Sequence, residues 1–495
     1  MSSCPIILAP IKSLRSYTKE RNNLEKGRFM PDELLKARID AYVDEVWDDA
    51  VKDMAYLIAV ESVEDLDHAA PDAPYGPASA EALRRALEIS ERLGLVPTNC
   101  NGHIGFSDLV GESGTQIATI AHVDIVPLGL GWNYPPLEVT RDRGFLIGRG
   151  IQDDKGPYIL SLYAAHFFAR QVAETGKKLP YTLRCIAGCN EETGMADVDW
   201  YLERYPAPAF CFTPDADFPL ICGEKGVYHG KFTSKPGLAG GALESIAGGT
   251  VPNAIPGRAE AVVAVAADTL PAQEHIFLEA LDGGRARIVA TGKGGHASLP
   301  AGTENAIDML AGYLAANIEL TDDQAVFFSL VKAAASASDG SALGIACADD
   351  KFGPLTAIGG TIATQEDGSI AQTIDVRYPA SITGEEITRR MAELAEAHGA
   401  SYELMDDAVP FYIEPTSPEI SALLATYREY TGSREAPLVI GGGTYARHFP
   451  RACAFGPDEP LVANPAWVGG EHGPDEGIAE ERLRCALKIY ILSIA

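Results

Sequence analysis

The sequence contains no apolar run long enough to cross a membrane. Its early apolar stretch, residues 5–10, is far shorter than the roughly 20 residues that a spanning helix needs. The same stretch lacks the charged leader and the small-residue cleavage site of a secretory signal peptide. We therefore expect a protein that neither inserts into a membrane nor is exported.

Basic residues are scarce relative to acidic ones. The chain has 40 lysines and arginines against 69 aspartates and glutamates, which gives a formal net charge of −29. A surface of this sign repels phosphate groups, so nucleic acids and anionic membranes are both disfavoured as partners.

The cysteines show no regular spacing. There are nine of them, an odd number, and they do not form the pattern of a disulfide framework. Cys185 and Cys189 lie in an apolar stretch that is typical of a buried strand, where packing is their ordinary role. We predict a cytoplasmic protein with reduced thiols.

The length indicates more than one domain. A chain of 495 residues exceeds the ~250–300 residues at which single cores stop growing. Up to about residue 228, strands alternate with helices, which is typical of an α/β sheet, and residues 1–30 read as a flexible arm. The predicted helices are 31–60, 80–93 and 158–170, and the predicted strands are 103–106, 116–123, 181–188 and 209–212.

The pattern changes at about residue 229. Short alternating runs and two helical stretches predict an inserted α+β lid domain at 229–409, between catalytic-domain parts at 1–228 and 410–495. The predicted lid strands are 260–266 and 285–290, and its helices are 306–317 and 387–398. After residue 410 the sequence predicts a helix at 418–430, a strand at 452–455 and a closing helix.

The chemistry begins at Thr119-Ile-Ala-His-Val-Asp124. Residues two apart in a strand point to the same face, so His122 and Asp124 lie together at the end of an apolar run. A carboxylate behind an imidazole is the usual way to orient a metal-bound histidine. A single His-x-Asp is also typical of a core histidine or a capped turn, and both alternatives stay open on this motif alone.

Polar residues follow three of the predicted strands. His122 ends one of them, Glu191 and Glu192 follow another, and Asp215 follows a third. In α/β sheets ligands bind beyond the carboxyl ends of the strands. The repetition predicts a site at that edge of the sheet.

The candidate ligands form a mixed nitrogen and oxygen set suited to zinc, with manganese or cobalt possible. They are His122, Asp153, Glu192, Asp215 and His472. Five ligands are too many for one tetrahedral ion with an open position, but they suit two ions that share one carboxylate. Because a metal lowers the pKa of bound water towards ~7, Glu191 is the natural general base, passing a proton to the leaving nitrogen.

Five motifs in order resemble the M20 family of dinuclear zinc peptidases and deacylases, from about residue 35 to the C-terminus. They are His122-x-Asp124, Gly148-Arg-Gly-x-x-Asp153-Asp-Lys-Gly156, Asn190-Glu-Glu-Thr-Gly194, Pro214-Asp215 and Glu471-His472-Gly473. Further similarity in Tyr75-Gly-Pro77, Gly223-Glu-Lys-Gly226 and Gly441-Gly-Gly-Thr-Tyr-Ala-Arg447, together with the long lid, favours the dipeptidase V type.

The resemblance implies a three-layer α/β catalytic domain of the zinc aminopeptidase type, interrupted by an α+β lid. It implies Asp153 as the bridging ligand, joined to Asp154 by a cis peptide bond. It further implies Asp124 as the residue that orients His122, and Glu191 as the catalytic base.

The resemblance also assigns roles in the lid. It implies that Asn253 and His296 polarise the scissile carbonyl and hold the oxyanion, which needs preorganised donors. It implies that Arg377 binds the substrate carboxylate, which suits the planar fork of a guanidinium. Simple turns at Asn253 and His296 and a structural ion pair at Arg377 are the alternatives. The backbone N–H groups of Gly441, Gly442 and Gly443 are further candidates for the same carboxylate.

The predicted reaction is hydrolysis of a small dipeptide with a free amino end. The alternative is deacylation of an N-acyl amino acid, as in a succinyl-diaminopimelate desuccinylase, and a catalytically silent binding protein is a third reading. A free amine needs an acidic partner, for which Asp124 and Asp217 are candidates. Because the lid resembles the enlarged version that replaces a partner subunit, we expect an active monomer.

Overall fold

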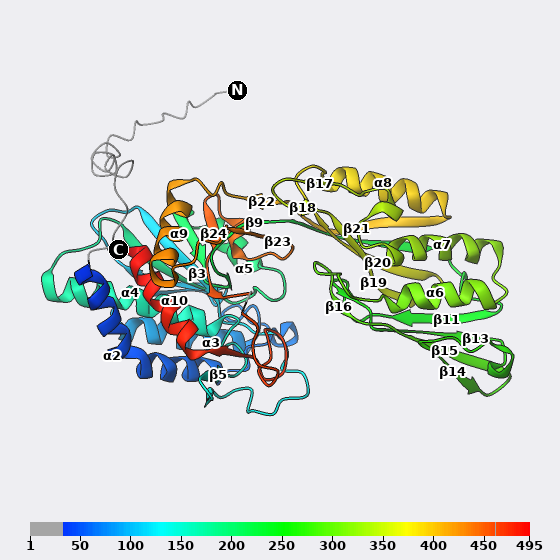
Figure 1. Ribbon diagram of the computed structural model, residues 1–495, viewed down its shortest axis with the longest axis horizontal. Coiled ribbons are helices and arrows are strands. Elements are labelled where there is room, and N and C mark those ends of the chain that lie inside the picture. Colours follow the sequence, from blue (N-terminus) through cyan, green and yellow to red (C-terminus); the bar gives the residue numbers. More distant parts are fainter. Residues whose placement is uncertain (1–32, 461) are drawn as a thin grey trace, which may run out of the picture.

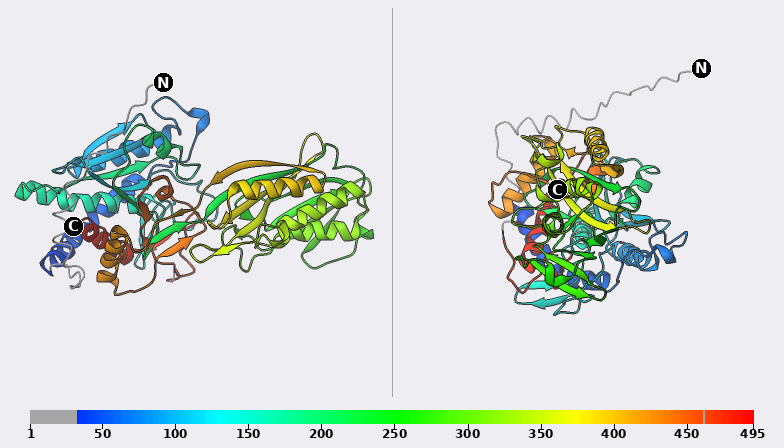
Figure 2. Two further views of the ribbon diagram at one scale, coloured as in Figure 1. Left: turned by 90° about the horizontal axis from the view of Figure 1, so that it is seen from above. Right: turned by 90° about the vertical axis from the view of Figure 1, so that its right-hand side faces the viewer.

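The computed structural model describes residues 33–460 and 462–495, so the predicted arm at residues 1–30 lies outside the described residues. The described chain forms two lobes that lie end to end along the long axis (Figures 1 and 2). The first lobe contains a nine-stranded sheet, and the second contains an eight-stranded sheet. No described helix is long and apolar enough to span a membrane.

The sheet of the first lobe has four parallel strands at its centre. In spatial order its path is β1 (Val96–Cys100), β2 (Ile104–Leu109), β6 (Thr182–Gly188), β3 (Gln116–His122), β7 (Phe210–Thr213), β24 (Ala452–Ala454), β9 (Ile221–Glu224) and β22 (Phe411–Tyr412), with β23 (Leu438–Ile440) beside β9. Strands β6, β3, β7 and β24 are mutually parallel, so their carboxyl ends meet at one edge of the sheet. That edge is where the sequence predicts the site.

Helices cover both faces of this sheet, as expected for a three-layer α/β fold. The main core lies between the sheet and α2 (Glu33–Ile58), α3 (Pro77–Arg92), α4 (Lys155–Thr175), α9 (Pro418–Thr431) and α10 (Glu480–Ile494). A smaller core on the other face takes in α5 (Ala196–Leu202) and the 3-10 turn η4 (Tyr445–His448). Helix α4 is buried on all sides over its first half, which explains why its sequence is apolar with little periodicity.

The second lobe is a single antiparallel sheet with helices on one face. Its strand order is β14 (Ile276–Leu281), β15 (Arg285–Thr291), β13 (Arg258–Val263), β11 (Leu243–Gly248), β19 (Thr356–Thr364), β20 (Ile370–Tyr378), β10 (Gly226–Ser234) and β21 (Ala400–Ala408). Burial alternates residue by residue along β10, because successive side chains point to opposite faces.

Three helices pack on this sheet around a second core: α6 (Ala306–Asn317), α7 (Asp322–Ser336) and α8 (Gly384–Ala397). The sequence pattern predicts α6 and α8, whereas α7 was not predicted. The sequence nevertheless carries a signal for the start of α7, because Thr321 and Gln324 form a reciprocal capping box.

Short elements complete the described chain. They are η1 (Leu66–His68), η2 (Ala267–Thr269), η3 (Ser341–Leu343), β4 (Thr140–Asp142), β5 (Phe145–Ile147), β8 (Ala216–Asp217), β12 (Ala254–Ile255), β16 (Gly295–His296), β17 (Ala348–Asp349), β18 (Gly353–Pro354), β25 (Pro457–Asp458) and β26 (Gly477–Ala479). The chain crosses between the lobes at Lys225, before β10, and again at Val409, after β21. The domain limits 1–228, 229–409 and 410–495 stay predictions, and β10 already joins the second sheet at Gly226.

Candidate metal centre

The predicted ligands all lie at the carboxyl edge of the first lobe's parallel strands or in loops that reach it. His122 ends β3, Glu192 follows β6, and Asp215 follows β7. Asp153 directly precedes the N-cap of α4, and His472 lies in the loop between β25 and β26. Five separate stretches of chain thus bring their side chains to one place.

Asp153 lies between the two imidazoles. Its Oδ1 is 2.8 Å from Nε2 of His122, and its Oδ2 is 2.8 Å from Nε2 of His472. The peptide bond from Asp153 to Asp154 is cis. One carboxylate that offers one oxygen to each histidine has the arrangement of a bridging ligand.

Each imidazole also has a carboxylate of its own. Asp215 Oδ2 lies 3.7 Å from Nε2 of His122, and Glu192 Oε2 lies 3.2 Å from Nε2 of His472. The result is two half-sites, each with one histidine, one private carboxylate and a share of Asp153. Ligand atoms of His122, Asp153 and Glu192 lie within 4.8 Å of one another.

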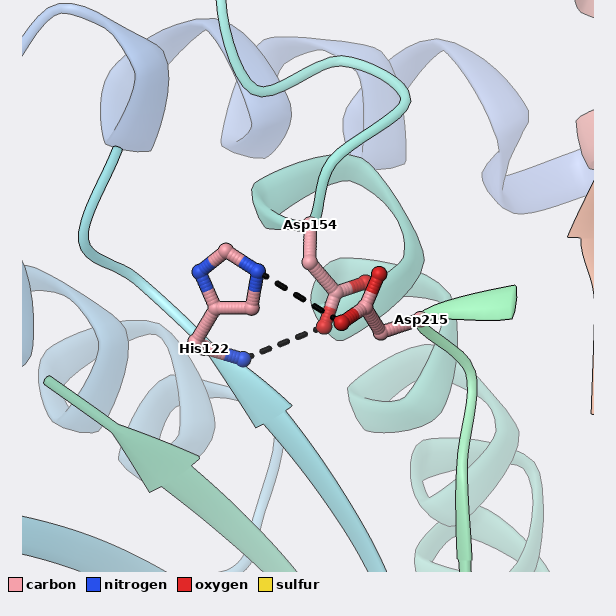
Figure 3. Close-up of side chains that lie close together, drawn as sticks. All are labelled: His122, Asp154 and Asp215. Carbon is pink, nitrogen blue, oxygen red and sulfur yellow. Dashed lines mark hydrogen bonds and ion pairs between the residues drawn. The ribbon is translucent and has the colours of Figure 1, made fainter. Parts of the chain in front are cut away.

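Asp154, which is not among the predicted ligands, also lies at the centre. Its ligand oxygen, the His122 ring and Asp215 form a second group within 4.8 Å, shown in Figure 3. One Asp154 oxygen accepts the backbone N–H of His122 at 3.1 Å, which explains its orientation. Its other oxygen, Oδ1, is buried without a hydrogen-bond partner.

The carboxylates favour positive charge at both histidines. Burial alone would lower the pKa of His122, but the bonded carboxylates of Asp124 and Asp153 outweigh it and raise that pKa well above its usual value. Hydrogen bonds that the His472 ring donates to Asp153 and Glu192 raise the pKa of His472 to about 11. Groups that hold a proton this strongly on an imidazole also attract a metal cation in the proton's place.

The remaining carboxylates carry more negative charge than the histidines can balance. Burial, together with the charges of neighbouring carboxylates, raises the pKa values of Glu191, Glu192 and Asp215. Buried charges of one sign require a compensating partner. Because the donors are imidazole nitrogens and carboxylate oxygens, and the Oδ1 atoms of Asp124 and Asp154 are buried without partners, the site fits divalent cations such as zinc.

Asp124 touches both halves of the site. Its Oδ1 lies 3.5 Å from Nδ1 of His122, and its backbone carbonyl lies 3.1 Å from the same nitrogen. Its Oδ2 accepts the backbone N–H of Glu192 at 3.1 Å. Asp124 therefore orients the ring of His122 and holds the turn that follows β6.

Glu476 is a buried residue whose part in the site was not predicted from the sequence. Its Oε1 accepts the backbone N–H groups of Gly150, Gln152 and Asp153 at 2.9, 3.1 and 3.2 Å. Its other oxygen pairs with Arg149. Glu476 lies four residues after His472, so the available signal was a carboxylate close to a candidate ligand. It fixes the loop that presents Asp153.

The predicted oxyanion residues lie together in the second lobe. Strands β12 and β16 pair so that Ala254 faces His296, and the backbone carbonyl of Asn253 accepts the N–H of Ala297 at 2.9 Å. Nδ1 of His296 lies 2.7 Å from Oγ of Ser298. Desolvation and the charge of Arg377 lower the pKa of His296, which favours a neutral ring.

The tip of the second lobe reaches the first lobe at Gly441. A Cβ atom added to Gly441 would lie 2.6 Å from Cβ of Ser298, so the two backbones approach closely there. This close approach brings the lid segment that carries His296 to the glycine-rich residues 441–443 of the same chain.

Arg377 is already engaged in the described structure. Its Nε and Nη2 donate to the two carboxylate oxygens of Asp375, each at 2.8 Å, and its Nη1 donates to the carbonyl of Gly441 at 3.0 Å. Nε2 of His229 lies 2.8 Å from the same Asp375. Gly441 thus offers Arg377 its carbonyl oxygen, and carboxylate binding by Arg377 and residues 441–443 stays a prediction.

Comparison with protein families gives one match over most of the chain. The model of the peptidase family M20/M25/M40 matches residues 118–495. A Beta-Ala-Xaa dipeptidase of Lactobacillus delbrueckii subsp. lactis is 30% identical over 437 residues, 86% of this chain and 90% of that relative. A putative dipeptidase of Staphylococcus aureus strain USA300 is 30% identical over 482 residues, 93% of this chain and 98% of that relative.

Solved structures resemble the fold at low sequence identity. Human carnosine dipeptidase 1 matches with a TM-score of 0.56 and 14% identity, covering 93% of this chain and 98% of that one. Aminoacylhistidine dipeptidase from Vibrio alginolyticus matches with a TM-score of 0.53 and 13% identity, covering 89% and 95%. At these identities the likeness concerns the fold.

Proposed function

This chain belongs to the peptidase family M20/M25/M40 and is an enzyme of the dipeptidase type, and from that premise we propose that it hydrolyses dipeptides with a free amino end at a dinuclear metal site. The observation that carries the proposal is Asp153, which offers one oxygen to His122 and the other to His472 at equal distances of 2.8 Å.

The proposed ligands are His122 and Asp215 for one ion, His472 and Glu192 for the other, and Asp153 for both. Zinc is the expected ion, with manganese or cobalt as possible replacements by ligand type. Bound there, two such ions supply Lewis-acid activation of the attacking water and of the scissile carbonyl.

Glu191 is the proposed general base. It directly precedes Glu192, and burial together with the charge of Asp215 raises the pKa of Glu191, which makes its carboxylate a stronger base than an exposed glutamate. It takes the proton from the attacking water and delivers it to the nitrogen that leaves as the peptide bond breaks.

The second lobe supplies the proposed contacts to the substrate. The neutral ring of His296 and the amide of Asn253 donate hydrogen bonds to the oxygen on which negative charge develops. Arg377 and the backbone N–H groups of residues 441–443 bind the C-terminal carboxylate. A single chain carries all of these residues, and the contact of Ser298 with Gly441 lies within that chain, which supports a monomeric enzyme. The eight described cysteines are free thiols, which supports a reducing, cytoplasmic location.

A substrate panel tests the proposal. Amine release is measured for free dipeptides beside N-acetyl and N-succinyl amino acids, with zinc or manganese added and with a chelator as control. We expect cleavage of free dipeptides that the chelator abolishes. Preference for the acylated compounds would replace the proposal with a deacylase at the same site, and inactivity on both sets would contradict the hydrolysis of dipeptides.

A further inference from the structure

The turn that carries Glu191 and Glu192 is anchored from beneath by a buried carboxylate. We call residues 189–193 the base turn. Asp197, in the first turn of α5, is fully buried, and its Oδ2 accepts the backbone N–H groups of Cys189 at 2.6 Å and of Asn190 at 3.2 Å. Its Oδ1 accepts the N–H of Val198 at 2.7 Å. Both oxygens of Asp197 are therefore occupied by backbone donors.

A tyrosine from a distant part of the chain completes this anchor. The hydroxyl of Tyr445 donates to Oδ2 of Asp197 at 2.6 Å, although 248 residues separate the two in sequence. Tyr445 is fully buried and fits beneath the end of β6, where a Cβ atom at Gly188 would lie 2.0 Å from the tyrosine oxygen. No residue larger than glycine fits at position 188 while the tyrosine occupies this place.

The other side of the base turn is held independently. Oδ1 of Asn190 accepts the N–H of Ala196 at 3.0 Å, and its Nδ2 donates to Glu64 at 2.8 Å. The backbone N–H of Glu192 donates to Asp124 at 3.1 Å. These contacts engage the side chain of Asn190 and the backbone of Glu192, and none of them uses the carboxylate of Glu191 or Glu192.

We propose that Asp197 and Tyr445 form a positioning pair that fixes the base turn, and that Tyr445 links this turn to the residues that meet the second lobe. Tyr445 belongs to the segment 441–447, and the carbonyl of Gly441 at its start accepts a hydrogen bond from Arg377 of β20. One continuous segment thus touches a predicted substrate-binding residue at its start and the anchor of the predicted base four residues later. This inference rests on the proposed function.

The physical basis is the concentration of donors on a single charged acceptor. Hydrogen bonds to an ionised oxygen are about twice as strong as bonds between neutral groups. A base displaced by about 1 Å from its reacting proton loses roughly 10²-fold in rate. An anchor of this kind contributes to the rate without touching the substrate, so its loss should lower kcat more than it changes KM.

Tyr445→Phe tests the link with the smallest change. It removes the hydroxyl and keeps the ring beneath Gly188. The matched control is Tyr42→Phe, which removes another buried hydroxyl of the first lobe, one that donates to the carbonyl of Tyr163 at 2.8 Å. We expect Tyr445→Phe to lower kcat about 10-fold on the best dipeptide, the lower end of the effect of residues that support metal ligands, with KM nearly unchanged.

Asp197→Asn tests the anchor itself. Because both oxygens of Asp197 receive N–H donors, an asparagine must turn its own NH₂ towards one of them. We therefore expect a larger fall in kcat than for Tyr445→Phe. Amide hydrogen exchange of residues 189–192 is measured in the same variants loaded with zinc. We expect exchange to be fastest in Asp197→Asn, slower in Tyr445→Phe, and slowest in the control Tyr42→Phe.

The two readouts separate this inference from the proposed function. If Tyr445→Phe matches Tyr42→Phe in kcat and in exchange of the base turn, the positioning pair is overturned. If thermal unfolding shifts equally in both tyrosine variants while kcat falls only in Tyr445→Phe, a merely structural role is excluded. If the wild-type protein cleaves no dipeptide, the proposed function fails, and exchange of residues 189–192 alone decides on the pair.

Discussion

The two lobes differ most in what they bury. The sheet of the second lobe packs its helices on an almost wholly apolar core, and among its described residues the only buried charged side chains are Asp375 and Arg377, which pair with each other. The first lobe buries many more. They are Asp53, His122, Asp124, Arg149, Asp153, Asp154, Lys155, Arg184, Asp197, Glu224, Asp475 and Glu476.

This difference agrees with the proposal that the first lobe holds the metal centre. Burying a charge costs free energy unless a partner compensates it. The dozen buried charged residues of the first lobe therefore require ion pairs, hydrogen bonds or a bound cation. The second lobe, with a single buried ion pair among its described residues, avoids most of that cost. Its one buried ion pair lies where Arg377 meets Gly441, at the boundary with the first lobe.

Removal of the proposed base in the first lobe should lower activity more than any change in the second lobe. Glu191→Ala deletes the proton acceptor of the first lobe and leaves the proposed ligands in place, so we expect kcat to fall about 10³-fold with metal binding retained. Steady-state kinetics and titration with zinc measure the two effects. Glu203→Ala, at an exposed glutamate of the same lobe, is the matched control. Unchanged kcat in Glu191→Ala would exclude it as the base.

The corresponding change in the second lobe should be smaller. His296→Ala removes one proposed donor to the oxyanion, and loss of such a donor typically costs about 10²-fold in kcat. The control is His275→Asn, at an exposed histidine of the same lobe whose positive φ asparagine tolerates. Equal kcat in His296→Ala and its control would exclude His296 from the mechanism. The second lobe would then contribute no oxyanion donor at this position.

The sequence predicts the parts of this comparison that are local. Three ligand motifs of the first lobe follow apolar runs, those of His122, Glu192 and Asp215, so the strand, its end and the polar residue are predicted from one short stretch. Strand β21 gave no such signal, because it is an edge strand with most of its residues exposed and with charges along its length.

Contacts between distant segments were beyond local patterns. Tyr445 and Asp197 meet because η4 and α5 pack on the same face of the sheet, which no motif records. The pairing of Arg377 with Asp375, two residues earlier, was open in the sequence because an arginine on a strand can serve a neighbour or a ligand. Both cases depend on tertiary packing.

Metal binding should sharpen the difference in stability between the lobes. Ligands that bind only the folded state stabilise it by about 2.7 kcal/mol at a concentration of 100 Kd. Because all proposed ligands belong to the first lobe, zinc should slow amide exchange around His122, Asp153 and Glu192 and leave the core of the second lobe, such as α6, unchanged. Equal protection of both lobes would show that the metal acts on the whole molecule.

Glu224 is a buried carboxylate of the first lobe that lies next to the connection between the two lobes. It ends β9, just before the first crossing, and is fully buried, with Thr444 donating to Oε1 at 2.7 Å. Its Oε2 has no hydrogen bond, and Nε of Arg447 lies 3.6 Å away. Arg447 instead donates to the carbonyls of Lys225 and Val409, one in each connection between the lobes. The buried carboxylate is thus only partly compensated.

The consequence is a stability difference that depends on pH. Burial, partly offset by Arg447, raises the pKa of Glu224 from 4.5 to about 7. Between these values the folded state binds more protons than the unfolded state, so this group's contribution to the free energy of unfolding falls as pH rises. Glu224→Gln does not titrate. The stability of the wild type relative to Glu224→Gln should therefore fall by roughly 2 kcal/mol between pH 5 and pH 7.5, measured by urea unfolding. Glu203→Gln should run parallel to the wild type, and a parallel curve for Glu224→Gln would mean that Arg447 compensates the carboxylate fully, as Arg377 pairs with Asp375 in the second lobe.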